Sequence, residues 1–526
     1  MKTLLRRTAT LLAGLFVLFV LIAPSDLEKF TFEAFLRVPL EGLVGVLLLV
    51  AVPDRFRRPA AIALGVALGV FTVVKIMDIG FDMVLYRPFD LVLDWPLLVP
   101  ALDFVDVTFG RFASVLAVVL TVALVVGIVF LAAVSVQRLG SVAAGRRPVT
   151  VRVVALAAVA CVSLAVPGIP VYSDAAATSV ADHARRFQAG LRDQEVFAAE
   201  ASVDAFRGHP GLLSALQGKD VVFTFVESYG KSALEMPDVA AKLADGDARL
   251  KARGYAAKSA YLTSPTAGGG SWMAQATLLS GLWIDNQQRY RNLVASDRLT
   301  LPRAFREASW RSVGVVPGIT QAWPEGDFFH YDEIYAAQDL GYAGPRFGYA
   351  TTPDQFTLES FQRNERAKQH GPVMAAIPMV SSHAPWSPTP DFVDWDELGD
   401  GSIYATMPAS NDPPESIFGR DPAAVRADYA HSVSYSLESV MSYLERYGDE
   451  NLVFVFLGDH QPAQMVTGEG ASKDVPITVV AKDPAVLHRI EGWKWDDGLK
   501  PGASAPVSRM SDFRDQFLSA FSPPKP

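Results

Sequence analysis

The chain has 526 residues, half of them hydrophobic, with a positive mean hydropathy and a formal net charge of −9 at pH 7. This composition excludes a basic nucleic-acid-binding protein and is unusual for a chain that is soluble throughout. Because the chain has one cysteine, Cys161, no internal disulfide can form.

The hydrophobic excess lies in the first third of the chain, in five apolar segments. They cover about residues 8–23, 38–52, 59–77, 112–136 and 149–166. Each is near the length of about 20 residues that a bilayer requires, although the second is short and carries Glu41. The first follows basic residues, as a signal peptide does, but no small-residue cleavage site comes after it, so we expect it to be retained. These segments predict a five-helix transmembrane anchor.

Basic residues flank this anchor on alternate sides. They precede the first span and separate the second from the third and the fourth from the fifth: Lys2, Arg6, Arg7, Arg55, Arg57, Arg58, Arg138, Arg146 and Arg147. The other loops are mixed or acidic, and the long one, residues 78–110, is rich in Pro, Trp and Phe. The positive-inside rule then predicts a cytoplasmic amino terminus and, after five spans, an extracytoplasmic remainder. Few charges lie inside the spans, which argues against a transporter.

The rest of the chain alternates strand-like and helical segments, which is typical of parallel β-α-β units. Strands are predicted at residues 221–226, 256–262, 312–317, 373–380, 452–457 and 475–480. Pro378 indicates an edge position or a bulge for the fourth of them. We therefore predict an anchor over residues 1–170, linker helices over 171–216 and one extracytoplasmic α/β domain with a mostly parallel sheet over 217–526.

Three of these strands deliver a carboxylate or an imidazole at their carboxyl ends. Glu227 follows the first, His383 follows the fourth, and Asp459 with His460 follows the fifth. Ligands of open α/β sheets bind beyond the carboxyl ends of strands, and carboxylates and imidazoles are metal ligands. One such terminus alone is more often an ordinary exit from a strand, but several at one rim predict a site.

A glycine-rich turn supplies a fourth group. Three glycines, residues 268–270, precede Ser271, which opens a helical pattern that stops at Gly281. A hydroxyl at a helix amino terminus faces unpaired amides and the positive end of the helix dipole. This position suits an anionic phosphoryl or sulfuryl group, although such a run is on its own more often a flexible turn.

Together these residues resemble the sulfatase-like branch of the alkaline phosphatase superfamily. The anchor followed by an external domain resembles, in architecture, its lipoteichoic acid synthase and phosphoglycerol transferase group. The resemblance implies one divalent ion, Mn or Mg rather than Zn or Ca, held by Glu227, Ser271, Asp459 and His460, with His383 contacting the substrate phosphate. A shared ion requires carboxylate oxygens of Glu227 and Asp459 within about 8 Å of each other.

The family pattern also selects the nucleophile. Sulfatases carry Cys-x-Pro-x-Arg and, nine and ten residues beyond the nucleophile, Thr-Gly or Ser-Gly. Counting from Ser271 reaches Ser280 and Gly281, which favours Ser271 over Thr263, Ser264 or Thr266. Met273 and Gln275 replace the Pro and Arg, so we expect an unmodified hydroxyl and phosphoryl transfer rather than sulfate ester hydrolysis.

This sequence departs from one part of the family pattern. The transferase group has an aromatic-rich segment with an Arg that grips the phosphate, and the matching residues 328–332 contain no Arg. Arg289, His330 or Arg346 is a candidate substitute, and a structural role is the alternative for each.

The resemblance implies a metal-dependent transferase that is an integral membrane protein of the cell envelope. It would move a phosphoglycerol-type headgroup from a membrane phospholipid to a glycan or glycolipid through a covalent intermediate on Ser271. The alternatives are a membrane-anchored phosphodiesterase or sulfatase, with water as acceptor, and a non-catalytic surface module.

Overall fold

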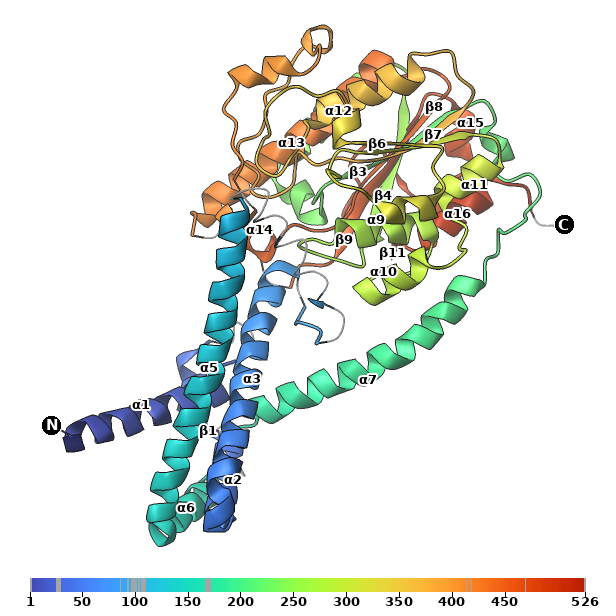
Figure 1. Cartoon of the computed structure of the whole chain (residues 1–526). Coiled ribbons are helices and arrows are strands. Elements are labelled where there is room, and N and C mark those ends of the chain that lie inside the picture. Colours follow the sequence, from blue (N-terminus) through green and yellow to red (C-terminus); the bar gives the residue numbers. More distant parts are fainter. Residues whose placement is uncertain are drawn as a thin grey trace. The chain divides into compact units, whose positions relative to one another are not determined.

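The computed structural model describes residues 2–24, 30–85, 87–91, 94–95, 102, 105, 110–165, 172–412, 414–417, 419–468 and 470–524. The chain forms two compact units, residues 1–83 with 87–192 and residues 84–86 with 193–526. The division falls within the long helix α7 (Ala175–Ser202), drawn in green in Figure 1. The domain limits at residues 170 and 216 stay a prediction.

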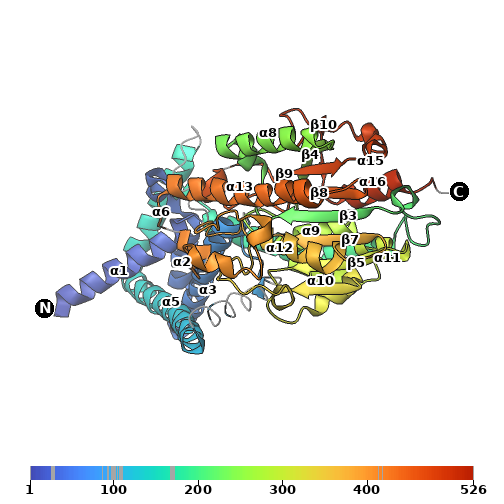
Figure 2. The same ribbon diagram turned by 90° about the horizontal axis from the view of Figure 1, so that it is seen from above.

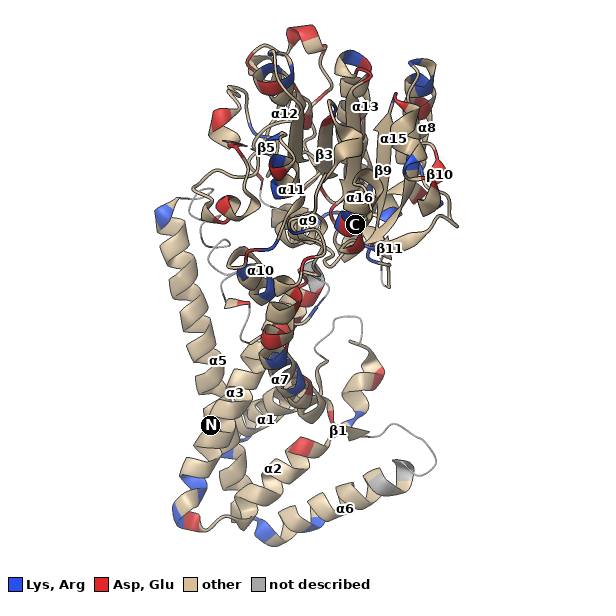
Figure 3. Ribbon diagram, turned by 90° about the vertical axis from the view of Figure 1, so that its right-hand side faces the viewer, with Lys and Arg blue, Asp and Glu red and all other residues tan. Residues whose placement is uncertain are grey.

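The first unit contains α1 (Lys2–Ile22), α2 (Leu40–Ala51), α3 (Asp54–Leu85), α5 (Arg111–Gly145) and α6 (Arg147–Ala165). Its short strands β1 (Val38–Pro39) and β2 (Tyr172–Ser173) pair in parallel. Long stretches of α3 and α5 carry no charge, which Figure 3 shows as tan ribbon. The first unit therefore provides a membrane-anchored region.

Three helices of the described residues are long and apolar enough to cross a membrane: Leu4–Ile22, Asp54–Asp82 and Arg111–Gly145. The count of five spans is therefore not confirmed. Helix α2 has 12 residues, about 18 Å at 1.5 Å per residue, which is less than the roughly 30 Å of a bilayer core. Helix α6, the predicted fifth span, is not among the three either. Much of the long loop over residues 78–110, including residues 96–101 and 106–109, lies outside the described residues.

The second unit contains a nine-stranded sheet in the order β10-β4-β9-β8-β3-β7-β5-β6, with β11 beside β4. The strands are β3 (Asp220–Val226), β4 (Ala256–Thr263), β5 (Arg311–Val316), β6 (Glu333–Ala336), β7 (Val373–Pro378), β8 (Leu452–Gly458), β9 (Asp474–Ala481), β10 (Asp496–Asp497) and β11 (Val507–Arg509). All six predicted strands are present. The other three, β6, β10 and β11, are short and partly exposed, so their sequences carry little periodic signal.

The sheet is mixed rather than mostly parallel. Strands β8, β3, β7, β5 and β6 run in parallel, but β9 is antiparallel to β8 and β4, and β10 is antiparallel to β4. The reason lies in the connection from β8 to β9, which contains only the four-residue helix α14 (Gln464–Thr467). A parallel return is usually made through a full helix that crosses the sheet, and the described residues between these two strands contain none.

Helices cover both faces of this sheet, so its central strands are buried continuously. Against one face pack α9 (Ser271–Ser280), α10 (Gln287–Val294), α11 (Leu301–Glu307), α15 (Pro484–His488) and α16 (Asp512–Phe521). Against the other pack α8 (Pro237–Ala252), α12 (Asp354–Phe361) and α13 (Pro422–Tyr447), and α13 runs along the sheet (Figure 2). Every residue of β3 and β8 is buried, as their largely apolar sequences predict.

Pro378 does not mark an edge strand. Strand β7 lies between β3 and β5, inside the sheet, and Pro378 is its last residue. The next residue continues the hydrogen bonding between β7 and β3, since the amide of Met379 donates to the carbonyl of Phe225 at 2.8 Å. A proline at this terminal position costs the sheet no ladder hydrogen bond from its centre.

Gly458 allows the exits of β8 and β3 to touch. A Cβ atom at this position would lie 1.8 Å from the carbonyl oxygen of Tyr229, a backbone atom that cannot rotate away. Any side chain would therefore separate the two loops that leave these strands.

We expect Gly458→Ala to destabilise the second unit by about 1–3 kcal/mol, since the added methyl group forces the two strand exits apart. Thermal unfolding of the full chain followed by tryptophan fluorescence measures the loss. Gly371→Ala is the matched control, because a Cβ there meets no atom within 4 Å. Equal unfolding temperatures for both variants would contradict the close approach.

Candidate active site

Three neighbouring parallel strands end at the same edge of the sheet. Strand β3 pairs with β8 on one side and β7 on the other, in parallel on both sides. Glu227 follows β3, Asp459 and His460 follow β8, and His383 follows β7. The parallel register therefore brings residues from three distant parts of the chain to one rim.

Helix α9 brings Ser271 to this rim. Gly270, the N-cap, has φ +82°, a left-handed conformation that favours glycine, and the helix begins at Ser271 and ends before Gly281 as predicted. The Ser271 hydroxyl donates to Glu227 Oε2 at 2.9 Å and lies 3.1 Å from His460 Nε2. The glycine-rich turn thus directs this hydroxyl toward the carboxylate of Glu227 and the imidazole of His460.

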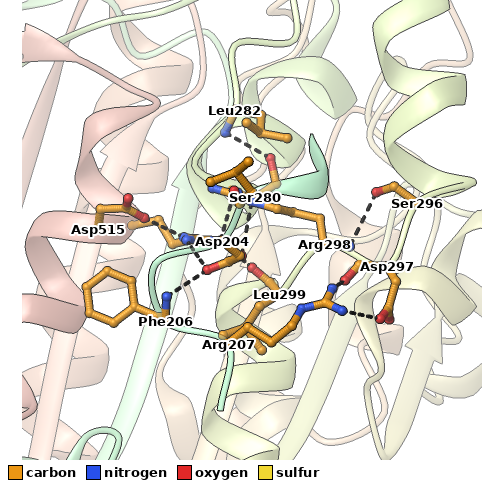
Figure 4. Close-up of polar contacts among 12 residues, drawn as sticks. Asp204, Phe206, Arg207, Ser280, Leu282, Ser296, Asp297, Arg298, Leu299 and Asp515 are labelled. Carbon is orange, nitrogen blue, oxygen red and sulfur yellow. Dashed lines mark hydrogen bonds and ion pairs between the residues drawn. The ribbon is translucent and has the colours of Figure 1, made fainter. Parts of the chain in front are cut away.

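The far end of α9 is held by a buried ion-pair network (Figure 4). Arg298 and Arg514 each donate to the carbonyl of Ser280 at 3.0 Å. Asp204 accepts from both guanidinium groups, at 3.2 Å from Arg298 and 2.8 Å from Arg514. Burial acts to raise the pKa of Asp204, but the two arginines hold it below its usual value. Together these contacts fix the helix that carries Ser271.

Glu227, Asp459 and His460 form a buried cluster whose ligand atoms all lie within 4.8 Å of one another. This separation is well inside the limit of about 8 Å for a shared ion. Asp459 Oδ1 accepts two backbone amides, of Ser228 and His460, at 2.8 Å each. Its Oδ2 is buried and has no hydrogen-bond partner among the described residues. One carboxylate oxygen of Asp459 is therefore anchored and the other is left for a ligand.

The His460 ring is oriented by its own backbone. Nδ1 lies 2.8 Å from the carbonyl oxygen of Gln461, which can only accept, so Nδ1 carries the proton. Nε2 is then the acceptor atom, and it lies 3.3 Å from Glu227 Oε1. This tautomer leaves a lone pair directed into the cluster, as a metal-binding histidine requires.

The ionisable groups of the cluster strongly affect one another's pKa. Burial acts to raise the pKa of Glu227, but His460 outweighs it and the pKa falls well below its usual value. Burial and the charge of Glu227 raise the pKa of Asp459 to about 7. Burial acts to lower the pKa of His460, but the two carboxylates raise it to about 9. Two carboxylates this close to each other in the protein interior need a positive charge beside them.

A divalent cation fits this donor set. It would find two carboxylates, a neutral imidazole nitrogen and a hydroxyl, which are ligands for Mg²⁺, Mn²⁺ and Zn²⁺ alike. The unpartnered Asp459 Oδ2 is the structural sign that favours this fit, because a buried carboxylate oxygen without a donor is costly. The structure thus contains a candidate metal site, and the identity of the ion stays a prediction.

His383 lies beside the cluster, close enough for its charge to lower the pKa of Glu227. Its Nδ1 lies 2.7 Å from the carbonyl of Ala384, so Nε2 is free to face a substrate. The ring stacks on Tyr349, with ring centroids 3.9 Å apart. Ser382 anchors the segment by donating to the backbone carbonyl of Glu227 at 2.7 Å.

Of the three predicted phosphate-gripping residues, two are engaged elsewhere. Arg289 donates to Asp193 at 2.7 Å and to the carbonyl of Trp283 at 2.9 Å. His330 ends the 3₁₀ helix Pro324–Phe329, and burial together with nearby arginines lowers its pKa. In the described part of the chain neither residue has a hydrogen bond or ion pair with the four-residue cluster. Arg346 differs, because its charge acts on Tyr349, the ring stacked on His383.

Sequence reasoning missed several residues that shape this site. Tyr349 stacks on His383, and Asp354 accepts the amides of Val380 and Ser381 at 2.8 and 2.9 Å, which holds the segment before His383. Both come from loops or helices with no local motif. Gln461 accepts from the hydroxyl of Ser232 at 2.8 Å, and its position directly after His460 was the one available signal.

The sulfatase family model matches residues 217–519, so the chain belongs to the sulfatase family and is an enzyme of that family. The candidate site lies within this match. No curated protein matches the chain in sequence.

Solved structures with a similar fold include lipoteichoic acid synthase LtaP from Listeria monocytogenes, with a TM-score of 0.39 and 13% identity over 63% of this chain and 77% of that chain. The phosphoglycerol transferase GacH from Streptococcus pyogenes, in complex with sn-glycerol-1-phosphate, has a TM-score of 0.37 and 14% identity over 63% and 80%. The lipooligosaccharide phosphoethanolamine transferase EptA from Neisseria meningitidis has a TM-score of 0.47 and 11% identity over 97% and 95%.

We expect Asp459→Asn to weaken Mn²⁺ binding to the full-length protein by more than about 100-fold, because it removes a carboxylate oxygen directed into the cluster. Calorimetric titration of the chelator-treated protein measures the affinity. Asp238→Asn, at the exposed start of α8, is the matched control and should bind as the natural chain does. Unchanged affinity in Asp459→Asn would exclude this residue as a ligand.

Proposed function

We propose that this chain transfers a phosphoglycerol-type, or related phospho-alcohol, headgroup from a membrane phospholipid to a cell-envelope glycan or glycolipid. The observation that carries this proposal is the position of the Ser271 hydroxyl, 2.9 Å from Glu227 Oε2 and 3.1 Å from His460 Nε2. A hydroxyl at the start of a helix and beside a candidate metal site is arranged for attack on an anionic ester.

Glu227, Ser271, Asp459 and His460 would hold the divalent ion, with Mn²⁺ or Mg²⁺ preferred to Zn²⁺ or Ca²⁺. Such an ion, when bound, lowers the pKa of a neighbouring hydroxyl and neutralises phosphate charge. The oxygen donors of Glu227, Asp459 and Ser271 support a hard cation. The neutral Nε2 of His460 supports Mn²⁺ within that group.

The first half of the reaction forms a bond between Ser271 Oγ and phosphorus and breaks the bond from phosphorus to the lipid alcohol. Before the attack, the hydroxyl proton, which Ser271 donates to Glu227 in this structure, is released to solvent water. The departing alcohol oxygen takes a proton from Nε2 of His383, while Nδ1 stays hydrogen-bonded to the carbonyl of Ala384. The product is a phosphodiester on Ser271 and a free lipid alcohol.

The second half transfers the group to the acceptor. An acceptor hydroxyl gives its proton to His383 Nε2, and its oxygen forms a bond to phosphorus. The bond from phosphorus to Ser271 Oγ breaks, and the serine oxygen takes a proton back from solvent water. Tyr349, whose ring stacks on the imidazole with centroids 3.9 Å apart, holds the His383 ring in place. Arg346, whose charge acts on Tyr349, is the candidate that we propose for gripping the phosphate.

The membrane region supports a lipid donor. Anchoring keeps the enzyme beside the bilayer, which raises the effective concentration of the lipid. The arginines that flank the helices support a cytoplasmic amino terminus and an extracytoplasmic catalytic domain in a multi-pass protein. The residues 385–420, which follow His383, are a candidate lid over the substrate.

We expect Ser271→Ala to lower transfer of a labelled phospholipid headgroup by at least about 1,000-fold, because it removes the attacking oxygen. Mass spectrometry of the trapped natural chain should find the headgroup phosphate on the Ser271 peptide, and the mass identifies the group. Ser434→Ala, a matched change on α13, should leave transfer intact. Undiminished transfer by Ser271→Ala would remove this residue from the mechanism. Release of free headgroup alone, despite added glycan, would indicate a hydrolase.

We expect His383→Gln to lower kcat by about 100- to 10,000-fold, the usual contribution of a general acid–base group. Metal affinity should not change, because His383 is outside the ligand cluster. His488→Gln, on an exposed helix end, is the control. Loss of metal binding together with activity would show that His383 holds the ion or the fold rather than a proton.

A further inference from the structure

The membrane unit contains a partly open cavity that the proposed chemistry does not use. Its volume is about 520 Å³, within the range of roughly 300–1,000 Å³ that small-molecule sites occupy. Helices α1, α2, α3 and α5 and the beginning of α7 line it, and all its lining residues belong to the first compact unit. Among these described residues Glu41 alone is ionisable, and the others are apolar or small.

The cavity is elongated along the helix axes. On α2 it is lined by positions 41, 42, 45, 46 and 49, one face of the helix over about 12 Å. On α5 it is lined by positions 136, 139, 140 and 143, again a single face. A slot that has apolar walls and runs along the helix axes accommodates an extended hydrocarbon chain.

A carboxylate with one unsatisfied oxygen marks one end of this slot. Glu41 lies in the first turn of α2, and its Oε1 accepts the amide of Ala177 at 2.8 Å. Its Oε2 is buried and has no hydrogen-bond partner among the described residues. The charge of Lys75 acts on Glu41, but its ammonium donates its hydrogen bonds to the carbonyl of Val20, at 2.9 Å, and to that of Ala23.

Three of the lining helices, α1, α3 and α5, contain segments long and apolar enough to cross a membrane, so the medium around the slot is lipid. An unpaired carboxylate oxygen in such surroundings is costly and marks a functional position. A ligand that matches both the apolar walls and Glu41 has a hydrocarbon chain and, next to it, an N–H or O–H donor.

We propose that this cavity binds one acyl chain of a membrane lipid whose head group donates from an amine or a hydroxyl to Glu41. This lipid site belongs to the anchor itself and does not depend on transfer through Ser271. The anchor is then a lipid-binding module as well as a tether.

Photo-crosslinking of the full-length protein tests the proposal. The protein is placed in nanodiscs that contain phospholipid with a diazirine on one acyl chain, with an ethanolamine, glycerol or choline head group in separate samples. After irradiation, we expect labelled peptides from α2 and the start of α7. The ethanolamine and glycerol samples separate an amine from a hydroxyl donor, and choline has neither. Labelling should be at least 3-fold weaker with choline.

Two changes that fill the slot from opposite walls, Ala181→Phe on α7 and Ala67→Leu on α3, should each reduce this labelling at least 5-fold. Ala189→Phe, at an exposed position of α7 outside the cavity, should leave it unchanged. Circular dichroism and gel filtration establish that each variant is folded. Labelling that persists in both folded filling variants, or that is confined to the outer faces of the helices, would overturn the proposal.

Glu41→Gln keeps the shape of the side chain and removes its charge. It should abolish the preference for ethanolamine lipid over choline lipid, whereas Glu33→Gln, at an exposed position, should retain that preference. If the hydroxyl of the glycerol head group is the donor, Glu41→Gln should instead abolish the preference for glycerol lipid over choline lipid. A head-group preference unaffected by Glu41→Gln in every sample would exclude Glu41 from the site.

Discussion

The structure of the second unit depends on one constraint, the parallel alignment of β7, β3 and β8 with their carboxyl ends at the same edge. Parallel neighbours place the residues that follow them side by side, whatever their separation in the chain. Glu227 and Asp459 therefore meet in a buried place where their negative charges need compensation. A protonated His460, or a bound cation with a neutral His460 as its ligand, would supply that compensation, and helix α9 adds Ser271 to the cluster.

Rigidity around the cluster comes from contacts that contain no reactive group. Backbone amides hold Asp459 Oδ1, a backbone carbonyl holds the His460 ring, and the network of Asp204, Arg298 and Arg514 holds the far end of α9. These contacts direct Asp459 Oδ2, His460 Nε2 and the Ser271 hydroxyl into the cluster. Such preorganisation means that binding of an ion or of a phosphate requires little rearrangement of the protein.

The two units share one feature, a buried carboxylate oxygen that has no hydrogen-bond donor among the described residues. In the second unit, a buried carboxylate oxygen without a donor, Asp459 Oδ2, marks the candidate metal site. In the first unit another, Glu41 Oε2, marks the site that we propose for a lipid. Their surroundings decide the ligand, because hard donors beside a strand edge favour a cation, whereas apolar walls inside a helical anchor favour a hydrocarbon chain. A membrane-anchored member of the sulfatase family with both features is suited to work on a lipid.

The sequence alone determined the local elements. Long apolar runs specify buried strands, so all six predicted strands, the start of α9 at Ser271 and the convergence of Glu227, Asp459 and His460 could be foreseen. The tertiary structure decided what depends on connections and distant partners: the reversed direction of β9, the interior place of β7, the stacking of Tyr349 on His383 and the pairing of Arg289 with Asp193. The physical reason is that strand propensity and burial are encoded within a few neighbouring residues, whereas strand direction, loop packing and ion pairing arise between segments far apart in the chain.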